Sequence, residues 1–390
     1  MKVIATEKLP IKMWLKDIEN EALDQAKNLA NLPFAFKHVA IMPDSHVGYG
    51  MPIGGVLATK GIVIPNAVGV DIACGVCAAK IQNQNISEYN EASLKFILGK
   101  IREAIPVGFE HHKERQSGIP LLESPILEVK NSIVYNQWDA AHYQLGTLGG
   151  GNHFIEIQAD EEDNVWVMIH SGSRNLGKKV CDYYNGIAKK LNEKWYSSVD
   201  PKWDLAFLPL DIEEGKCYME EMQYCMEFAY ANRMHMMRAI QNIISIFNGA
   251  EFGNVINIAH NYAALENHYG QNVVVHRKGA TRARKDEVGI IPGSMGTNSY
   301  IVKGLGNVES FMSCSHGAGR KMGRNAAKSG LDLSTEIAEL DRKGVIHGIR
   351  NSSDLDEAPG AYKDVEEIMK QQADLVVPIV KLRPLASIKG

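Results

Sequence analysis

Six residues able to bind a metal ion or to attack a phosphorus atom occur in short segments, most of which contain glycine. One carboxylate, one thiol and three imidazoles belong to Asp71, Cys74, His153, His170 and His260, and a further imidazole belongs to His316. A carboxylate, a thiolate and imidazoles together suit one or two divalent ions of intermediate softness. Because small residues and an arginine follow His316, we interpret it as a reactive histidine beside a metal site.

The elements that must position these residues are predicted strands that end beside them. Apolar runs at 61–65 and 76–81 flank the segment with Asp71 and Cys74, and three further runs end immediately before a histidine: 164–169 before His170, 255–259 before His260 and 272–275 before His276. Short apolar runs of this kind are typical of buried strands. Since rigid strands fix the side chains at their ends, the sequence predicts a metal site where several strands terminate.

The rest of the pattern predicts a single α/β domain over residues 1–390 with a helical insertion at about 178–247. A helix at 15–29 is followed by a strand at 38–42, which we expect to end at Pro43. In the insertion, apolar residues recur at three- and four-residue spacing and predict one buried helix face, formed by Met222, Cys225, Ala229, Met237, Ile240, Ile244 and Phe247. We interpret these methionines as core residues rather than as the lining of a binding groove.

Composition excludes several classes of protein. The chain has 390 residues, of which 45% are hydrophobic, and its net charge of -4 disfavours binding of nucleic acid through overall positive potential. Two local basic segments, 276–285 and 320–324, are interpreted as phosphate-binding. The six cysteines are too dispersed for a disulfide framework. Without a secretory leader or an apolar run of about 18 residues, we expect a cytoplasmic protein with no membrane contact.

Two patterns have competing interpretations. Cys74 and Cys77 form a CxxC pair, as in redox proteins and zinc knuckles, but neither a second such pair nor a thioredoxin-like pattern accompanies it. The glycines at 146–151 do not have the spacing of a dinucleotide-binding loop. We therefore expect these glycines to let the backbone approach a ligand closely.

A series of motifs, taken in order, resembles the RtcB family of RNA-splicing ligases. The resemblance runs from about residue 12 to the end, and its motifs are Met42-Pro43-Asp44-Ser45-His46, Gly69-Val70-Asp71-Ile72-Ala73-Cys74-Gly75, Gly151-Asn152-His153-Phe154-Ile155-Glu156, His170-Ser171-Gly172-Ser173-Arg174, His260-Asn261-Tyr262, Arg277-Lys278-Gly279-Ala280, Ile291-Pro292-Gly293-Ser294-Met295-Gly296, Ser313-Cys314-Ser315-His316-Gly317-Ala318-Gly319-Arg320 and the final Lys389-Gly390. Each motif alone is weak, but their common order is specific. The sequence departs from the family pattern only mildly, at Ala73 and with the additional thiol of Cys77.

The resemblance implies a single large α/β domain with mixed sheets around a central cleft for two metal ions. It further implies that two Mn(II) ions share the thiolate of Cys74, with Asp71 and His153 on one ion and His170 and His260 on the other. His316 matches the family's nucleophile, which attacks the α-phosphorus of GTP and carries GMP. Asp44 and His46 are expected either to orient metal ligands or to form a buried structural pair, while Cys314 and Ser315 are expected to be packing residues.

The nucleotide contacts are also implied by the resemblance. Glu156 is expected to accept from the N1–H and N2–H donors of guanine, with Tyr362 and Lys389 nearby, and we expect Lys389 to be ordered. The full set of expected GTP or GMP contacts is Asn152, His153, Phe154, Ile155, Glu156, His260, Asn261, Pro292, Gly293, Ser294, Met295, Ser299, His316, Gly317, Ala318, Gly319, Tyr362 and Lys389. Arg174, Arg320 and Arg324 are expected to contact RNA phosphates, the last two from one helix face if the chain is helical there.

The implied reaction joins an RNA 2′,3′-cyclic phosphate or 3′-phosphate end to a 5′-hydroxyl end, in RNA repair or tRNA splicing. An activator of the archease type is a candidate partner. Three alternatives use some or all of the same residues: a dinuclear phosphoesterase, an enzyme that caps 3′-phosphates with GMP without sealing, and an RNA-binding protein without activity. Formation of a protein–GMP adduct on His316 separates the first and third from a ligase, and a 5′-hydroxyl partner strand separates sealing from capping.

Overall fold

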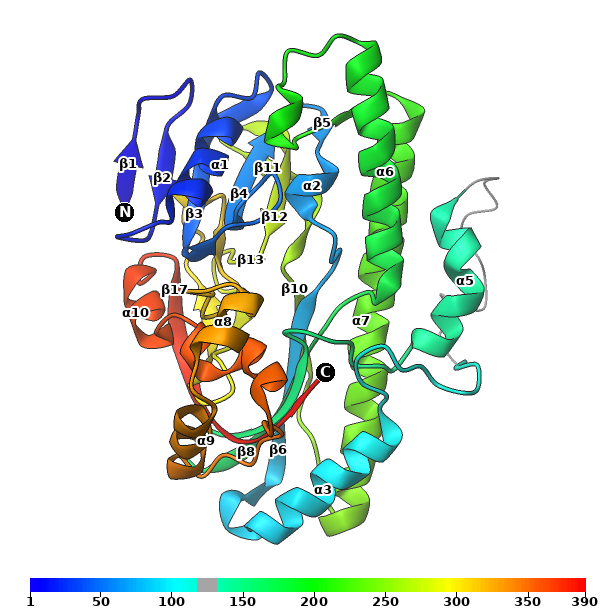
Figure 1. Ribbon diagram of the computed structural model, residues 1–390, viewed down its shortest axis with the longest axis vertical. Helices are drawn as coiled ribbons and strands as arrows, with labels where there is room; N and C mark the ends of the chain where they lie inside the picture. The colour runs from blue at the N-terminus through cyan, green and yellow to red at the C-terminus, as the bar shows by residue number, and fades with distance from the viewer. Residues whose placement is uncertain (118–131) are drawn as a thin grey trace.

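The computed structural model describes residues 1–117 and 132–390, in which strands form two large sheets flanked by helices (Figure 1). Within this described part, the first sheet has six strands in the order β1-β2-β3-β4-β12-β11. Their bounds are β1 Lys2–Ile4, β2 Ile11–Met13, β3 Ala35–His46, β4 Ile53–Thr59, β12 Gln271–Lys278 and β11 Asn261–His268. Neighbouring strands are antiparallel except β2 and β3, which are parallel. This sheet lies above the second sheet in Figure 1.

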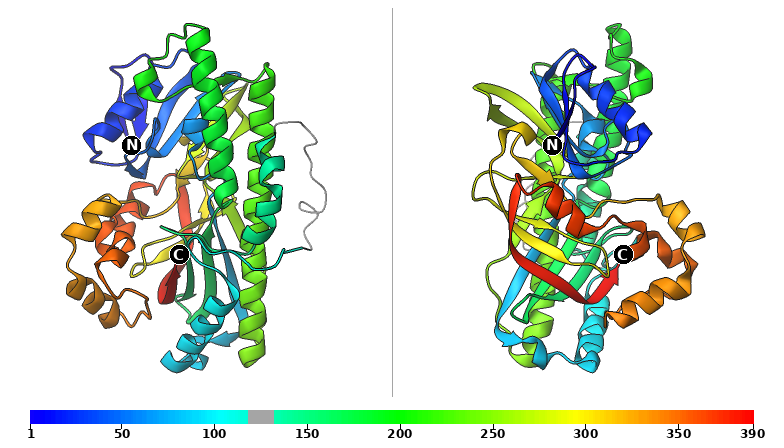
Figure 2. Two further views of the ribbon diagram at one scale, coloured as in Figure 1. Left: turned by 45° about the vertical axis from the view of Figure 1, so that its right-hand side comes forward. Right: turned by 90° about the vertical axis from the view of Figure 1, so that its left-hand side faces the viewer.

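The second sheet contains most of the elements that carry the candidate site. Among the described residues it has seven antiparallel strands in the order β10-β6-β8-β7-β17-β15-β14. Their bounds are β10 Ile256–Ala259, β6 Gly75–Asn85, β8 Asn164–Ser171, β7 Phe154–Ala159, β17 Val376–Lys389, β15 Ser299–Gly304 and β14 Val288–Ile291. The last strand of the chain, β17, is thus inserted in the middle of the sheet, between β7 and β15 (Figure 2).

Helices and short two-stranded ribbons complete the structure. The ribbons pair β5 (Ile62–Val63) with β9 (Leu208–Pro209) and β13 (Ala280–Arg282) with β16 (Ser313–Ser315). The helices are α1 Asn20–Ala30, α2 Pro65–Val68, α3 Glu91–Ala104, α5 Ile133–Gln144, α6 Asn175–Lys194, α7 Glu213–Asn248, α8 Arg324–Gly330, α9 Leu333–Arg342 and α10 Val365–Gln371. Short 3-10 turns lie at Ile86–Glu88, Pro201–Trp203, Val308–Ser310, Ser352–Glu357 and Pro359–Ala361. In the described residues, no helix combines the length and the apolar character needed to span a membrane.

The predicted helical region at 178–247 corresponds mainly to α6 and α7, which lie side by side along the molecule (Figures 1 and 2). Six residues of the predicted buried face are buried as expected: Met222, Cys225, Ala229, Met237, Ile240 and Ile244. Phe247 is an exception, because it is 38% exposed and packs against Phe96 of α3. Since α7 contacts β6, β8 and β10 of one sheet and β11 of the other, we propose that this region is part of one domain rather than a separate unit.

Two element boundaries differ from the sequence prediction. The helix expected from residue 15 begins at Asn20, because β2 precedes it and the buried side chain of Leu15 packs in the core beside this strand. The strand expected to end before Pro43 continues to His46 as β3. Proline cannot donate a ladder hydrogen bond, and the pairing of β3 with β4 shifts register between Ile41 and His46, which accommodates Pro43. This continuation carries Asp44 toward the candidate site.

Candidate active site

The five predicted metal ligands lie at the ends of strands that are neighbours in the second sheet. Asp71 and Cys74 occupy the turn before β6, His153 directly precedes β7, His170 lies near the end of β8, and His260 follows β10. Because β6 pairs with both β8 and β10, and β7 pairs with β8, these chain segments converge at one edge. The predicted strands before His170 and His260 are therefore confirmed as β8 and β10.

The ligand atoms form two groups that share one sulfur. The Sγ of Cys74 lies 3.2 Å from Nε2 of His170 and 3.5 Å from Nε2 of His153. On one side, Nε2 of His170 is 3.4 Å from Nε2 of His260, and on the other, Nε2 of His153 is 3.3 Å from Oδ2 of Asp71. In the described residues, Cys74, His170 and His260 thus form one candidate metal site and Asp71, Cys74 and His153 form another.

Burial favours the neutral form of the His170 and His260 imidazoles. Loss of solvent around His170 and His260 lowers the pKa of both imidazoles well below its usual value, and nearby histidines lower it further. The backbone carbonyl of Asn152 lies 3.0 Å from Nδ1 of His170, so this nitrogen carries the proton and donates it, which leaves a lone pair on Nε2. A neutral imidazole whose lone pair faces the cluster is the form that binds a metal ion.

The same surroundings disfavour an anionic sulfur unless a cation is near. Burial, followed by the charge of Asp71, raises the pKa of the Cys74 thiol well above its usual value. Metal binding removes a thiol proton directly, and a thiolate can bind two cations at once. Since imidazole lone pairs, a carboxylate and this sulfur converge on one place, the donor set fits one or two divalent ions.

His316 lies beside this cluster and is held by Asp44. Oδ2 of Asp44 accepts from Nδ1 of His316 at 2.6 Å, and it also accepts from the backbone N–H groups of His316 at 3.0 Å and of Gly317 at 3.3 Å. The ring of His316 is 4.8 Å from the ring of His260, centroid to centroid. Because Nδ1 of His316 carries the proton and donates it to Asp44, Nε2 of His316 retains its lone pair and is free to act as a nucleophile.

The sequence identified Asp44 but assigned it a different task. It was expected to orient metal ligands or to form a structural pair with His46, whereas its carboxylate contacts the predicted nucleophile. His46 contacts the backbone carbonyl of Asp44 through Nδ1 at 3.1 Å, and burial lowers the pKa of His46 to about 4. Gly319 (φ 72°) packs against the Asp44 backbone so closely that a Cβ there would collide with the Asp44 carbonyl oxygen.

The residues beside His316 have a packing role, as expected. Cys314 and Ser315 are buried, with 1% and 0% exposure. The backbone N–H of Ser315 donates to Oε1 of Gln372 at 3.0 Å, and Oγ of Ser315 accepts from Nε2 of Gln372 at 2.6 Å. These contacts fix the strand β16 that delivers His316.

Several predicted nucleotide contacts, among them the guanine contacts Glu156 and Lys389, lie on one face of three adjacent strands. Phe154 and Glu156 of β7 face the same side, and Lys389 of β17 pairs with Phe154, so that its Nζ lies 5.1 Å from the centre of the Phe154 ring. The predicted order of Lys389 is therefore confirmed by its place in a central strand. Ser299 begins β15, the next strand, and its Oγ is 3.1 Å from Nε2 of Gln158.

Glu156 is the titratable group at the centre of this face. It is 2% exposed, and its Oε2 accepts from Nε2 of Gln158 at 2.8 Å. Burial raises the pKa of Glu156 to about 7, although the charge of Lys389 acts in the opposite direction. A buried carboxyl that is easily ionised at neutral pH is well suited to accept hydrogen bonds from a ligand.

Other predicted nucleotide contacts surround this face or reach it only through the backbone. The side chain of Ile155 packs in the hydrophobic core on the opposite face, so only its backbone is available to a nucleotide. Asn261 donates from Nδ2 to the Asp71 carbonyl at 3.0 Å and accepts at Oδ1 from the Gly279 N–H at 2.7 Å. The turn after β14 carries the remaining predicted residues Pro292, Gly293, Ser294 and Met295.

The arginines after His316 are arranged differently from the prediction. The expectation of one helix face is wrong, because α8 begins only at Arg324 and Arg320 lies in a bridge with Tyr362. Both guanidinium groups instead converge on the buried carboxylate of Glu357, at 2.9 Å from Nη1 of Arg320 and 2.8 Å from Nε of Arg324. Tyr362 also donates its hydroxyl to Glu357. Sequence reasoning missed Glu357, since no spacing relates it to residues more than thirty positions earlier.

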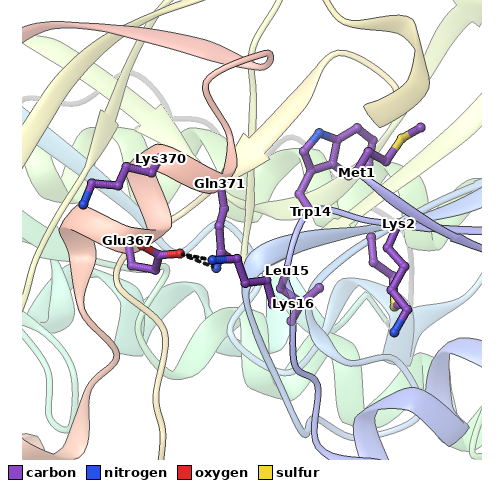
Figure 3. A pocket seen from close by; sticks show the side chains of 9 residues that line it. Met1, Lys2, Trp14, Leu15, Lys16, Glu367, Lys370 and Gln371 are labelled. Atoms are coloured by element: carbon purple, nitrogen blue, oxygen red, sulfur yellow. Dashed lines mark hydrogen bonds and ion pairs between the residues drawn. The ribbon is translucent and has the colours of Figure 1, made fainter.

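Two of the hollows among the described residues differ in their distance from the predicted site. A cavity of about 300 Å³ is lined by residues including Gly151, Met295, Glu357 and Lys389, all close to the guanine-contact face. A second hollow, of about 610 Å³, lies between the N-terminal strands and α10, where Lys16 and Gln371 both contact Glu367 (Figure 3). The described lining of this second hollow includes no residue predicted for the site, so we assign it no part in the chemistry.

Comparisons with known proteins show similarity to one family over nearly the whole chain. A family model described as tRNA-splicing ligase RtcB matches residues 25–390. The chain is similar to the RNA-splicing ligase RtcB of Escherichia coli strain K12, with 38% identity over 100% of this chain and 99% of that protein. It is also similar to proteins named tRNA-splicing ligase RtcB from Nanoarchaeum equitans, at 33% identity over 100% of this chain and 95% of that protein, and from Thermococcus kodakarensis, at 32% identity over 100% and 94%.

Proposed function

Because this chain belongs to the RtcB family of RNA ligases, we propose that it joins RNA 2′,3′-cyclic phosphate or 3′-phosphate ends to 5′-hydroxyl ends with GTP and Mn(II). The reaction passes through a GMP group on His316 and then through an RNA 3′-end that carries GMP. Repair of broken RNA and tRNA splicing are the two processes that this chemistry serves. An archease-type activator is included in the proposal on the basis of the family resemblance alone.

The main support for a His316-linked intermediate is the position of His316 between Asp44, the candidate metal cluster and the glycine-rich turn that follows it. Asp44 holds its Nδ1, the ring of His260 places it against the candidate metal cluster, and the glycine-rich turn after it leads to Arg320. A phosphoesterase would require only the cluster and a water molecule, and would have no use for an imidazole held in this way. The geometry therefore favours transfer of a nucleotide through His316.

In the first proposed step, Nε2 of His316 attacks the α-phosphorus of GTP, a nitrogen–phosphorus bond forms, and pyrophosphate leaves. The Nδ1 proton remains on the imidazole and is held by Asp44, which stabilises the positive charge that the ring acquires. Where the RNA ends in a 2′,3′-cyclic phosphate, water first opens it: the water oxygen bonds to phosphorus, the bond to the 2′-oxygen breaks, and the 2′-oxygen takes a proton, which gives a 3′-phosphate. An oxygen of the RNA 3′-phosphate then attacks the phosphorus of the His316-bound GMP, and the nitrogen–phosphorus bond to His316 breaks. The RNA 5′-hydroxyl finally attacks the RNA phosphorus, and GMP leaves as the phosphodiester bond forms.

The candidate ligands would hold two Mn(II) ions, with Cys74 shared, Asp71 and His153 at one ion, and His170 and His260 at the other. Ions there supply positive charge to phosphate oxygens during displacement. The carbonyl of Asn152 and the surrounding strands keep the imidazole rings oriented. We propose that Arg174, Arg320 and Arg324 bind RNA phosphates. Because Arg320 and Arg324 already pair with Glu357, an RNA phosphate must either bind them together with Glu357 or displace the Glu357 carboxylate from them.

The GTP affinity is expected to increase about tenfold as the pH rises from about 6 to about 8. The ionised form of Glu156 accepts both guanine donors, and its pKa of about 7 means that the ionised fraction grows through this range. Titration of GTP binding into the His316→Ala variant, which cannot form an adduct, measures this effect. The matched variant Glu156→Gln should bind GTP more weakly and lose the part of the pH dependence that the carboxyl provides. Identical pH curves for both proteins would contradict the assignment of Glu156.

The complete reaction is tested with a labelled RNA that ends in a 3′-phosphate and a second RNA with a 5′-hydroxyl. With GTP and Mn(II), we expect a sealed product that contains the labelled phosphate in a linkage resistant to phosphatase. Without the 5′-hydroxyl strand, the RNA should accumulate with GMP on its 3′-end. An enzyme that only caps would give this second species under both conditions, and a phosphoesterase would release the label without any requirement for GTP.

A further inference from the structure

Phe109 is a fully exposed aromatic side chain next to the candidate active site. It is 98% exposed, although the loop that carries it is attached to its surroundings on both sides. Before it, the backbone N–H of Leu148 donates to the Pro106 carbonyl at 2.9 Å, and the N–H of Gly108 donates to the Gly149 carbonyl at 3.0 Å. After it, the N–H of His112 donates to the Tyr143 carbonyl at 3.0 Å. The loop is therefore fixed while the ring points into solvent.

The attachment of this loop places Phe109 close to the metal ligands. Gly149 (φ 93°) packs so tightly that a Cβ there would collide with both the Arg174 guanidinium and Nδ1 of His153. Nη2 of Arg174 also donates to the carbonyl of Gly108 at 3.0 Å, which is the residue immediately before Phe109. A single chain of contacts thus connects Phe109 through Gly108 and Gly149 to the predicted ligand His153.

Two guanidinium groups lie along the same glycine segment. A Cβ on Gly150 would lie 3.7 Å from Cα of Gly108, and a Cβ on Gly151 would lie 2.8 Å from Nη2 of Arg324. Arg174, Arg324 and Gly108, the residue before Phe109, are therefore adjacent to three consecutive glycines. Cationic groups that bind the phosphate backbone and aromatic rings on which bases stack are the combination by which proteins hold single-stranded RNA.

We propose that Phe109 is a stacking platform for the nucleobase of the terminal nucleotide of an RNA end. This inference rests on the proposed ligase function and deepens it by assigning a base-binding subsite. The ring takes the base of the end nucleotide, while Arg174 and Arg324 contact its phosphates. Stacking tolerates every base because each presents an aromatic face, which suits an enzyme that joins ends of different sequence.

The test begins with protein that has already been loaded with GMP and measures KM and single-turnover sealing for RNA. Phe109→Leu, which keeps an apolar side chain but removes the ring, should raise the KM for RNA roughly 5- to 100-fold, and Phe109→Tyr should restore it. GMP loading should be unchanged in both variants. Tyr196→Ala is the matched control, since Tyr196 is 94% exposed but lies beyond the far end of α6.

Abasic RNA identifies the base and the end. Two RNAs are compared with wild-type protein, one abasic at the 3′-phosphate end and one abasic at the 5′-hydroxyl end. We expect one of the two to raise KM by the same factor as Phe109→Leu, and that RNA carries the base that stacks on Phe109 when it is intact. With that abasic RNA, Phe109→Leu should cause no additional loss, because the stacking partner is already absent. A normal KM in Phe109→Leu would overturn the proposal. The proposal would also be overturned if Phe109→Leu raised KM with each abasic RNA by the same factor as with intact RNA, because the ring and the base would then act independently. Failure of wild-type protein to load GMP would instead overturn the proposed function.

Discussion

Replacement of His316 with alanine is expected to lower formation of the protein–GMP adduct by at least about 10⁴-fold, which is effectively to the background. The reason is that His316 is the imidazole that lies beside the metal cluster with its Nδ1 held by Asp44, and alanine leaves no nucleophile in that position. Labelled GTP with Mn(II), followed by an acid-lability assay and mass spectrometry of the intact protein, measures the adduct. Thermal unfolding of the variant should be unchanged, which would show that the loss of adduct does not come from misfolding. We expect this because the His316 side chain lies at the edge of the site and is 14% exposed.

Asp44→Asn provides a graded companion to this variant. Asparagine retains the shape of the side chain but can also donate a hydrogen bond, so it no longer enforces protonation at Nδ1 of His316. We expect adduct formation to fall by about 10²- to 10⁴-fold while remaining detectable. A normal adduct yield in His316→Ala would show that another residue carries GMP. A normal rate in Asp44→Asn would show that Asp44 has only a structural role.

The sequence identified the candidate ligands that the structure brings together, because their chemical types are visible without coordinates. Asp71, Cys74 and the three histidines belong to residue types that bind metals, and each lies at the start or the end of an apolar run that forms a strand. What the sequence could not provide was the pairing order of those strands. The convergence of the ligands depends on β6 lying between β8 and β10, and such non-local pairings have no local signature.

The partners of charged residues were the least predictable part of the site. Asp44 and His316 are separated by 272 positions, and Glu357 follows Arg320 by 37 positions, so neither contact belongs to a helix or a turn. A spacing of four residues suggested that Arg320 and Arg324 share a helix face, but that pattern applies only if the chain is helical between them. The structure instead uses Glu357 to bring both guanidinium groups together.

Tertiary packing also decided the boundaries of the elements. The periodicity of residues 15–29 is helical, yet Leu15 is buried beside β2 and the helix starts five residues later. Phe247 continues the apolar spacing of α7 but reaches its end, where solvent is near and Phe96 covers only part of the ring. Periodicity thus predicts that an element exists more reliably than where it ends.

Replacement of Cys74 with serine is expected to weaken Mn(II) binding at least about 100-fold and to lower adduct formation by about 10³-fold or more. Cys74 is the only one of the described ligands common to both candidate sites, so its loss affects two ions at once. A serine hydroxyl has nearly the same size, but it does not lose its proton as a thiol does and cannot bridge cations in the same way. Equilibrium dialysis with metal analysis measures the number and affinity of bound ions.

Cys77→Ser is the matched control, because Cys77 is also completely buried and lies only three residues further along the chain. Its side chain packs in the hydrophobic core behind β6 and donates weakly to the carbonyl of Arg233, away from the candidate ligands. Serine at this position should therefore reduce thermal stability modestly and leave both the stoichiometry of Mn(II) and the yield of adduct unchanged. If Cys74→Ser behaved like Cys77→Ser in dialysis, the sulfur would have no role in metal binding, and the two clusters would have to function without a shared ligand.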